Sequence, residues 1–386
     1  MDTIIQQLAQ TLRAASTDKT PIRIIGGNSK NFYGNACTGE VLSTTAYRGI
    51  VDYEPTELVI TARAGTPLIE IESALREKGQ MLAFEPPHFG KAFPSPLAPL
   101  LRFKCALVPE GEGNVVLAAE NNSHATLGGC IAAGLSGPRR AYSGAVRDLV
   151  LGVRMLDGKG TDLKFGGQVM KNVAGYDVSR LMAGSLGTLG VILEVSLKTL
   201  PLPATELTLQ QQHTEAEAIR LMNTWAGQPL PISATAWCDG SLHLRLSGAH
   251  SAVEAARKKL GGTVLDAAQA LHFWQGIRDH SAAYFAGDSA LWRLSVKSTA
   301  PAITLPGAQL IEWSGALRWL RTDVGADVVR AAATSAGGHA TLFRGGDRSH
   351  GVFHPLLPAL AKIHRRLKQT FDPAGILNPG HLYADM

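Results

Sequence analysis

The chain has few cysteines, and none of them forms a pair with metal-binding spacing. Only four occur among the 386 residues, and Cys37, Cys105, Cys130 and Cys238 lie far apart without a C-x-x-C motif. This spacing excludes the usual iron–sulfur and zinc motifs, and a disulfide framework is not expected in a chain of this length. The sequence therefore predicts neither a cysteine-based metal centre nor a disulfide-stabilised fold.

Long apolar runs and strong charge clusters are also lacking. No apolar run reaches the roughly 18–20 residues that a membrane-spanning helix requires. The first residues, Met1-Asp2-Thr3-Ile4, show no basic and apolar segments of a signal peptide. The formal charge is a modest +5, and Lys and Arg cluster only at residues 362–368, so we expect no nucleic-acid partner. We expect a cytoplasmic protein without a transmembrane segment, although the positive charge permits an acidic partner or a membrane surface.

Two common nucleotide-binding motifs are absent. No G-x-x-x-x-G-K-[ST] run occurs, which excludes a P-loop. A Rossmann site needs a strand, then G-x-G-x-x-G, then a helix. Here the glycines of residues 184–190 follow a helix-like segment and precede a strand-like one, so the order is reversed.

Glycine, in contrast, is abundant and clustered. Gly26-Gly27-Asn28-Ser29-Lys30 follows the short strand pattern of residues 22–25, and further glycine-rich runs occupy residues 125–137 and 184–190. Glycine permits positive φ and close approach of the backbone, and the exposed N–H groups of such turns hold phosphate oxygens. Tight packing of small residues explains one such cluster equally well. Three clusters favour a backbone that wraps around a long phosphate-containing cofactor, with Lys30 as a counter-charge.

The length and patterning predict two domains with mixed structure. Hydrophobic residues make up 45% and charged residues 18%, as in ordinary soluble globular proteins. Helical periodicity over residues 4–15 precedes the first strand, and Pro201 and Pro203 mark a boundary. Beyond it, strand patterns at 241–246 and 291–296 and a helix at 252–260 indicate a second α+β unit.

Several motifs together resemble the flavoprotein superfamily of vanillyl-alcohol oxidase and p-cresol methylhydroxylase, and within it the FAD-binding subunits of bacterial glycolate dehydrogenases, also called glycolate oxidases. The resemblance covers nearly the whole chain. The segments that carry it are residues 26–29, 125–129, 133–140, 144–148, 171–177, 187–192, 343–348 and 371–380. The block from 124 to 200 is specific, whereas residues 26–29 alone are not.

The resemblance implies an α+β fold with a two-lobed FAD-binding domain of the p-cresol methylhydroxylase (PCMH) type and a smaller α+β cap domain. The expected boundaries are residues 1–203 for the FAD domain, 204–342 for the cap and 343–386 for a segment that returns to the flavin. The expected cofactor-binding residues are Gly26, Gly27, Asn28, Ser29, Lys30, Thr126, Gly128, Gly129, Gly134, Ser136, Gly137, Gly190, Ile192 and Asn378. Non-covalent FAD is expected because no His or Cys lies within residues 26–30.

One departure from the family pattern concerns residues 91–122. In the family, the His-Phe-Gly of residues 88–90 leads almost directly into the Ala-Thr-Leu-Gly-Gly of residues 125–129. Here about thirty residues intervene, and this segment is rich in proline and lacks a clear period. We interpret it as a long loop or an insertion that is dispensable for folding; a partner-binding loop and a defect in the sequence are the alternatives.

Oxidation of a 2-hydroxy acid requires a base for the hydroxyl proton and a cation for the carboxylate beside the flavin. Metal-dependent relatives supply the cation through spaced histidines and a Glu-His pair, and this pattern is incomplete here. Gly338-His339 matches only its first part, so we expect no metal. Arg344 and Arg348 belong to a glycine-rich turn in the segment that leads back to the FAD domain, and an arginine fork suits a carboxylate. Surface ion pairs explain both arginines equally well. His339 is a further catalytic candidate.

Two functional roles remain open from the sequence. The chain either oxidises glycolate to glyoxylate at its own FAD, or it is an FAD-containing electron-transfer or scaffold subunit beside a catalytic homologue. The resemblance implies a complex with a homologous FAD subunit and an iron–sulfur subunit, with possible peripheral association at the inner face of the cell membrane. Because the metal-binding pattern is missing, we expect little glycolate-driven flavin reduction by the isolated chain.

Overall fold

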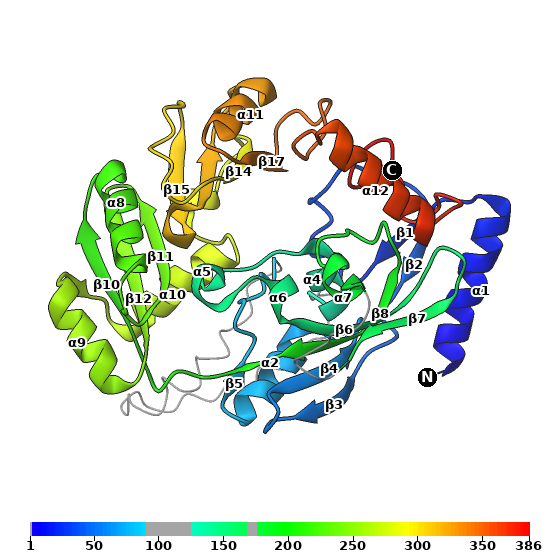
Figure 1. Ribbon diagram of the computed structural model, residues 1–386, viewed down its shortest axis with the longest axis horizontal. Helices are drawn as coiled ribbons and strands as arrows, with labels where there is room; N and C mark the ends of the chain where they lie inside the picture. The colour runs from blue at the N-terminus through cyan, green and yellow to red at the C-terminus, as the bar shows by residue number, and fades with distance from the viewer. Residues whose placement is uncertain (1, 90–124, 168–175) are drawn as a thin grey trace, which may run out of the picture.

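The computed structural model describes residues 2–89, 125–167 and 176–386. The expected insertion at residues 91–122 therefore lies outside the described residues, as do residues 171–175 of one family motif. Two bodies are visible in Figure 1: an N-terminal domain on the right, which also holds the C-terminal tail, and a cap on the left and at the top. Their mixed helices and strands confirm the predicted α+β class.

The first elements build the side of the N-terminal domain that later receives the tail. Helix α1 (Asp2–Asp18) packs Leu8 and Leu12 into a cluster with Ile22 and Leu377, as its helical periodicity predicts. Strand β1 (Ile22–Ile25) pairs in parallel with β2 (Glu40–Ser43). The tail continues this small sheet, because the Ile22 N–H donates to Ile376 O at 2.7 Å and the Asn378 N–H donates to Ile22 O at 2.9 Å.

A five-stranded antiparallel sheet forms the rest of the domain, in the order β3-β4-β8-β6-β7. Its strands are β3 (Ile50–Glu54), β4 (Val59–Arg63), β6 (Val150–Leu156), β7 (Asp162–Gly166) and β8 (Val191–Lys198). Helices α2 (Leu68–Glu77) and α4 (Leu127–Ala133) pack on it, and β5 (Gln80–Met81) pairs with β9 (Leu200–Pro201). Three helices of one turn each complete the domain: α5 (Arg140–Ser143), α6 (Val146–Leu149) and α7 (Val178–Leu181).

The cap is one eight-stranded antiparallel sheet in the order β13-β10-β12-β11-β15-β16-β14-β17. Its strands are β10 (Thr205–Gln212), β11 (Ile232–Cys238), β12 (Ser241–Gly248), β13 (Thr263–Val264), β14 (Leu291–Ser295), β15 (Ala308–Glu312), β16 (Leu317–Arg321) and β17 (His339–Arg344). Its helical segments are α8 (Glu215–Ala226), α9 (His250–Leu260), α10 (Ala267–Arg278), η1 (Ala283–Phe285), η2 (Trp313–Gly315) and α11 (Ala326–Ser335).

The two faces of the cap sheet have different neighbours. Val253 of α9 packs with the leucines of β12, and Val329 of α11 packs with Trp292 and Leu294 of β14 on the outer face. The inner face packs against the N-terminal domain and the 274–285 region. Both faces are therefore covered, which is why buried residues are consecutive along β12 instead of alternating.

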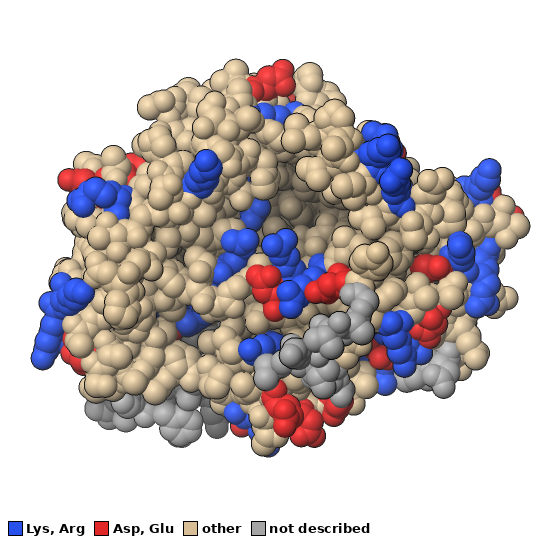
Figure 2. All heavy atoms as spheres, in the orientation of Figure 1, with Lys and Arg blue, Asp and Glu red and all other residues tan. Residues whose placement is uncertain are grey.

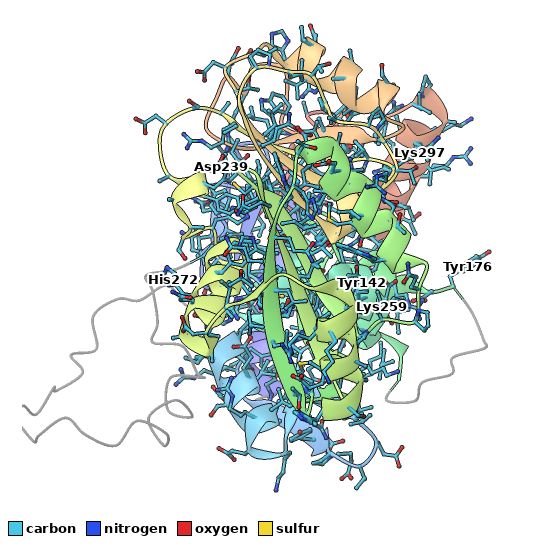
Figure 3. The ribbon with its side chains drawn as sticks, turned by 90° about the vertical axis from the view of Figure 1, so that its left-hand side faces the viewer. Tyr142, Tyr176, Asp239, Lys259, His272 and Lys297 are labelled. Carbon is cyan, nitrogen blue, oxygen red and sulfur yellow. The ribbon has the colours of Figure 1, made fainter. Side chains whose placement is uncertain are left out.

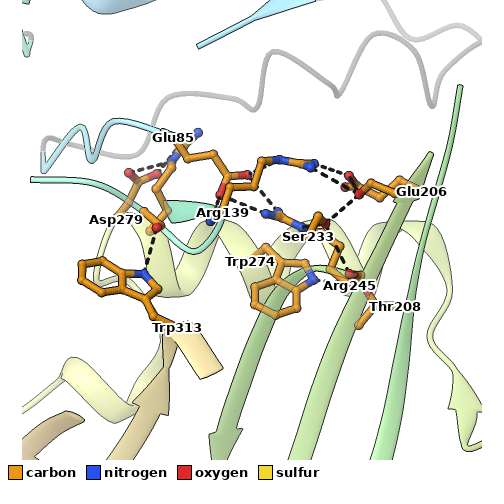
Figure 4. A network of polar contacts seen from close by, with 12 residues as sticks. Glu85, Arg139, Glu206, Thr208, Ser233, Arg245, Trp274, Asp279 and Trp313 are labelled. Atoms are coloured by element: carbon orange, nitrogen blue, oxygen red, sulfur yellow. Dashed lines mark hydrogen bonds and ion pairs between the residues drawn. The ribbon is translucent and has the colours of Figure 1, made fainter. Parts of the chain in front are cut away.

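A buried ion network joins the cap to the N-terminal domain (Figure 4). Glu85 accepts from the Arg139 backbone N–H at 2.8 Å and pairs with the Arg245 guanidinium of β12 at 2.9 Å. The Arg139 guanidinium pairs in turn with Glu206 of β10, which also accepts from Ser247 Oγ at 2.6 Å. The side chains of Arg139 and Arg245 are buried and that of Glu85 is mostly so, whereas Glu206 is exposed at the edge of the network. The buried charges therefore depend on their partners for compensation.

Two further hydrogen bonds tie η2 of the cap to the segment after α4. Trp313 Nε1 donates to Gly137 O at 3.0 Å, and the hydroxyls of Tyr142 and Ser314 lie 2.8 Å apart. Figure 3, which views the molecule from the cap side, shows Tyr142 among the side chains of this junction. After β17 the chain returns to the N-terminal domain through α12 (Pro358–Phe371) and the tail.

Candidate functional site

A cleft of about 1080 Å³ lies where β1, α4, the 348–355 segment and the tail meet. Its volume is at the upper end of the roughly 300–1,000 Å³ typical of ligand sites. Figure 2 shows a hollow in this face of the molecule, with Lys and Arg atoms along its edge. Eight of the fourteen residues predicted to bind the cofactor line the cleft. They are Gly26, Gly27, Asn28, Ser29, Lys30, Thr126, Gly129 and Asn378.

The turn after β1 presents backbone donors to this cleft. Asn28 has a φ of 56°, which turns the chain sharply after the two glycines. Among the described residues, nothing accepts a hydrogen bond from the N–H groups of Asn28, Ser29 and Lys30. Consecutive unpaired N–H groups in a tight turn form a concave site for phosphate oxygens. The turn thus offers the unpaired backbone N–H groups that a phosphate site requires.

The N-terminus of α4 lies directly against this turn. Thr126 caps the helix, and its Oγ1 accepts from the N–H groups of Gly27 and Gly129, each at 3.4 Å. A Cβ on Gly26 would lie 2.3 Å from this oxygen, so only glycine allows the turn to come so close. The hydrogen bonds of Thr126 thus hold the 26–30 turn and the N-terminus of α4 next to each other on the same wall of the cleft.

Gly128 and Gly129 have different surroundings. A Cβ on Gly128 would lie 2.7 Å from the Cβ of Ala64 in the domain core. A Cβ on Gly129 would approach only Thr126 Oγ1, at 3.3 Å, among the described residues. Gly129 borders the cleft, so a side chain there would occupy cofactor space, whereas Gly128 serves helix–sheet packing.

Three other predicted residues adjoin a smaller cavity of about 60 Å³ behind the cleft. Gly128, Gly190 and Ile192 line this cavity together with Asn378. A Cβ on Gly190 would meet the backbone oxygen of Leu156 at 2.8 Å, so this glycine is required by strand packing. The cavity extends the cleft toward the start of β8.

Both polar atoms of the Asn378 side chain make hydrogen bonds to backbone groups of the protein. Its Oδ1 accepts from the Ile24 N–H, and its Nδ2 donates to Leu186 O, both at 2.7 Å. Its φ is 41°, which bends the tail back toward the cleft. Asn378 therefore holds the floor of the cleft in place through its side chain.

The remaining predicted cofactor residues lie on the cap side of α4. Gly134 ends the helix at a φ of 66° and is packed against Gly184. Ser136 Oγ accepts from the Val146 N–H at 3.0 Å. Ser136 and Gly137 line a separate small pocket of about 20 Å³ that borders the cap sheet.

Lys30 is a cation with few partners. Its Nζ lies 3.4 Å from Ser29 Oγ and 5.7 Å from the centre of the Phe89 ring. Burial lowers the pKa of Lys30, with weak opposition from Cys130 and Asp279. An anionic ligand in the cleft would supply the compensation that this ammonium lacks.

Sequence reasoning did not identify the polar groups of the small pocket at the cap sheet. Arg293 of β14, Glu312 of β15 and His280 after α10 line it with aromatic residues. The Arg293 guanidinium makes no hydrogen bond or ion pair within the described residues and lies 5.2 Å from the centre of the Trp313 ring. Burial lowers the pKa of Arg293, and its charge acts on Tyr33, a cleft residue. The pocket thus adjoins the cleft.

Two protonation states in this pocket follow from its contacts. Burial raises the pKa of Glu312 to about 7, although its Oε1 accepts from Trp319 Nε1 at 2.7 Å. The pKa of His280 lies well below its ordinary value, first through burial and then through the charges of Arg344 and Arg293. Because Arg344 can only donate, the 3.2 Å contact with His280 Nδ1 leaves the imidazole proton on Nε2.

The two arginines predicted to be catalytic both contact Phe32, and each is engaged with groups of the protein. Arg348 lines the cleft, but its guanidinium donates to Gly34 O at 3.0 Å and Phe32 O at 2.7 Å. Arg344 lies over the Phe32 ring at 5.3 Å and contacts His280. His339 is exposed at the start of β17. Both arginines are thus occupied by contacts within the protein.

Residues 2–89, 125–167 and 176–386 contain no group of three His, Cys, Asp or Glu side chains arranged to hold a metal ion. In the same part of the chain, no helix combines the length and apolarity needed to cross a bilayer.

The cleft fits the FAD that the resemblance implies. Its volume suits a large cofactor, the turn offers unpaired N–H groups, and Gly129 leaves space beside Thr126. The residues that would hold the phosphates are those of the 26–30 turn, and the tail around Asn378 lies across the cleft from them.

Comparisons with known proteins agree with this geometry. Residues 3–92 match the family model described as an FAD binding domain, and residues 345–382 match that of the C-terminal domain of FAD linked oxidases. The chain is 46% identical over 381 residues to the glycolate oxidase subunit GlcE of Escherichia coli, covering 99% of this chain and 98% of that protein. It is 27% identical to the glycolate oxidase subunit GlcD of Bacillus subtilis, over 55% of this chain and 38% of that protein.

A solved structure shows the same fold over most of the chain. The alkyldihydroxyacetonephosphate synthase superposes with a TM-score of 0.61 at 15% identity, covering 97% of this chain and 75% of that one. The family models and the FAD-linked relatives confirm FAD as the cofactor. This chain belongs to the FAD-linked oxidases, in the group that includes the glycolate oxidase subunit GlcE.

Proposed function

We propose that this chain is the FAD-binding subunit of a multi-subunit dehydrogenase that oxidises glycolate to glyoxylate and passes the electrons to an acceptor. The E. coli relative at 46% identity is named a glycolate oxidase subunit, which supports both the substrate and a heteromeric assembly. The partners we propose are a homologous FAD subunit and an iron–sulfur subunit. The FAD is non-covalent and the complex acts on the cytoplasmic side.

The observation that carries substrate oxidation in this chain is the unpartnered Arg293 beside the cleft. Arg293 makes no hydrogen bond or ion pair within the described residues, and Glu312 acts on its charge only at longer range. A substrate carboxylate would give this partly desolvated guanidinium the close anionic partner that it lacks. Glu312 and the Nε2–H of His280 border the same pocket. A 2-hydroxy acid would therefore meet a cation, a proton acceptor and a hydrogen-bond donor together.

Each of these three residues would have a separate role in the oxidation of a 2-hydroxy acid. Arg293 holds the substrate carboxylate, and His280 Nε2–H donates to a substrate oxygen. Glu312, when ionised, accepts the hydroxyl proton through an Oε atom. Bound FAD supplies the hydride acceptor for the Cα hydrogen. The products balance as the 2-oxo acid, one proton on Glu312 and one hydride, that is two electrons and a proton, passed to the cofactor.

The size of the pocket supports a small substrate. About 20 Å³ is little more than the space of one water molecule, so a two-carbon acid enters only if a neighbour such as Phe89 moves. A substrate with an additional methyl group must displace more of the aromatic side chains that line the pocket. We expect glycolate to be preferred over lactate by roughly 10–200-fold in kcat/KM.

A second candidate is the electron-transfer or scaffold role, with substrate oxidation in the homologous partner. The observation that favours it is the engagement of Arg344 and Arg348 with backbone and aromatic groups of the protein. These were the carboxylate-binding candidates of the sequence. Under this role, electrons reach the FAD of this chain only from another subunit.

Anaerobic stopped-flow mixing with glycolate separates the two roles. The FAD-loaded isolated chain and the assembled complex are compared by bleaching of the flavin absorbance. Rapid, saturable bleaching in the isolated chain supports oxidation at Arg293. Bleaching in the complex but not in the isolated chain supports the electron-transfer role and contradicts a complete site in this subunit.

A further inference from the structure

Helix α12 carries a compact row of exposed aliphatic side chains. Leu357 at its N-cap is 70% exposed, Leu360 is 46% exposed and Ile363 is 52% exposed. Their spacing of three residues places them along one edge of the helix, over about 9 Å. The other large apolar side chains that are exposed in the described part of the chain come from separate elements. Single exposed residues are ordinary, whereas a row on one helix indicates a binding surface.

The C-terminal half of α12 fixes this row in place. Lys368 is buried, and its Nζ donates to Thr188 O at 2.9 Å and to Leu377 O at 2.6 Å. It also pairs with Asp372 at 2.7 Å. Leu367 and Phe371 pack against the core of the N-terminal domain. Because that half of the helix is anchored, the N-terminal half projects its aliphatic row outward without help from a partner.

The flank of the row is positively charged. Lys362 and Arg366 are exposed, and within the described residues neither side chain has an ion-pair or hydrogen-bond partner. Arg365 is paired with Asp385 at 3.0 Å. No Asp or Glu occurs from Arg348 to Phe371. Figure 2 shows blue side chains over the position of α12, beside the hollow. A complementary surface would be apolar with an acidic border.

The position of α12 links this surface to the cleft. The segment from Arg348 to Pro355 lines the cleft and leads directly into the helix. A molecule bound on α12 would therefore lie at the border of the cleft. A second redox subunit at this border would lie close to the bound FAD.

We propose that Leu357, Leu360, Ile363, Lys362 and Arg366 form the docking surface for a partner subunit of the complex, which presents an apolar pocket bordered by carboxylates. The inference rests on the proposed heteromeric function. A protein is favoured over a lipid surface because the row is only three side chains long. Even a whole acyl chain gives only reversible membrane binding, whereas a few central apolar anchors carry much of a protein interface.

The test uses the full chain together with the purified homologous FAD subunit and iron–sulfur subunit. A triple variant, Leu357→Ser/Leu360→Ser/Ile363→Ser, and a charge variant, Lys362→Glu/Arg366→Glu, are compared with Val264→Ser/Val328→Ser, which removes exposed apolar groups of the cap. Sedimentation velocity measures assembly, and flavin content and Tm measure folding. We expect each α12 variant to weaken assembly at least tenfold with unchanged flavin content and Tm, and the cap variant to assemble normally.

The outcomes distinguish failure of the proposed docking surface from failure of the proposed heteromeric function. If the wild-type chain stays monomeric beside both subunits, the complex itself is contradicted, and the surface with it. If the complex forms and the α12 variants assemble like the wild type, only the surface is contradicted. Binding of the wild type to phosphatidylglycerol vesicles that the triple variant loses, with assembly unchanged, would assign α12 to a lipid surface and overturn the proposal.

Discussion

The cleft that we assign to the cofactor and the small cap pocket that we assign to the substrate are built in different ways. On the N-terminal domain, the cofactor side consists of backbone: the 26–30 turn and Gly129 offer N–H groups and open space. On the cap, the substrate side consists of side chains: Arg293, Glu312 and His280 come from different elements and meet in one pocket. A backbone site tolerates side-chain changes that do not fill it, whereas a side-chain site loses its chemistry with one substitution. This contrast can be tested from either side.

The largest expected effect is loss of FAD in Gly129→Val. The new side chain would extend into the cleft from a position where only Thr126 Oγ1 is near, so we expect nearly complete loss of bound flavin with little change in Tm. The measurement is the ratio of flavin to protein absorbance after gel filtration. Gly128→Val is the matched control, since its Cβ faces Ala64 and overpacking there costs about 1–3 kcal/mol of folding stability. Stoichiometric FAD in a folded Gly129→Val protein would exclude this side of the cleft as the cofactor site.

Substitution of Arg293 tests the cap side. Arg293→Gln removes the charge that we assign to the substrate carboxylate, and we expect kcat/KM for glycolate to fall about a hundredfold. FAD content should not change, because Arg293 is not part of the cofactor surface. Arg293→Lys should recover part of the rate, since it restores the charge but not the planar fork. If Arg293→Gln lost bound flavin to the same extent as catalytic rate, the cofactor site and the substrate site would not be separate.

The ion network between the two bodies predicts an acid-sensitive junction. Burial by itself raises the pKa of Glu85, but Arg245 and Arg139 outweigh it and lower the value to about 2. A lowered carboxyl pKa gives stability that is present above the unfolded value near 4.5 and is lost as the pH falls toward 2. We expect Glu85→Gln to cost roughly 3 kcal/mol at pH 7. Urea unfolding at pH 7 and pH 3 measures this, and the difference between wild type and variant should shrink at pH 3.

The smallest expected effect is a pH dependence of flavin reduction. With a pKa of about 7, Glu312 is ionised and able to accept a proton above that pH, and neutral below it. The rate of glycolate-driven reduction should therefore rise with pH and level off above about 7, with roughly a tenfold loss one unit below. Glu312→Gln should be slow and independent of pH in this range. A wild-type rate that does not vary from pH 6 to pH 8 would contradict this role.

The contrast between a cofactor site built from backbone and a substrate site built from side chains explains which features could be predicted from the sequence. The turn at Gly26–Lys30 and the glycines near residue 128 are contiguous, so their function is visible in a short segment. The α+β class and the strand at residues 22–25 also follow from local periodicity. Arg344 and Arg348 were predicted because they belong to a glycine-rich turn in the segment returning to the FAD domain and a guanidinium suits a carboxylate. Side-chain direction is set by the fold, however, and both side chains contact other groups of the protein.

Arg293, Glu312 and His280 were not predicted because they are far apart in the sequence and only the folded cap brings them together. The register places Arg293 opposite Trp319, and Trp319 opposite Leu310 on β15. One signal was present: in Leu291-Trp292-Arg293-Leu294-Ser295, an arginine interrupts an otherwise apolar strand. A charged residue at such a position is rarely buried without a partner or a function.

The assignment of the cleft to the cofactor and of the small cap pocket to the substrate is tested most directly by binding of oxalate, a two-carbon dicarboxylate that carries no hydrogen to transfer. Oxalate is titrated into FAD-loaded wild type and Arg293→Gln, and binding is followed by the change in the flavin absorbance spectrum. The account predicts saturable binding to the wild type, weakened about a hundredfold in the variant, with equal FAD content in both. Equal oxalate affinity in the two proteins would contradict it.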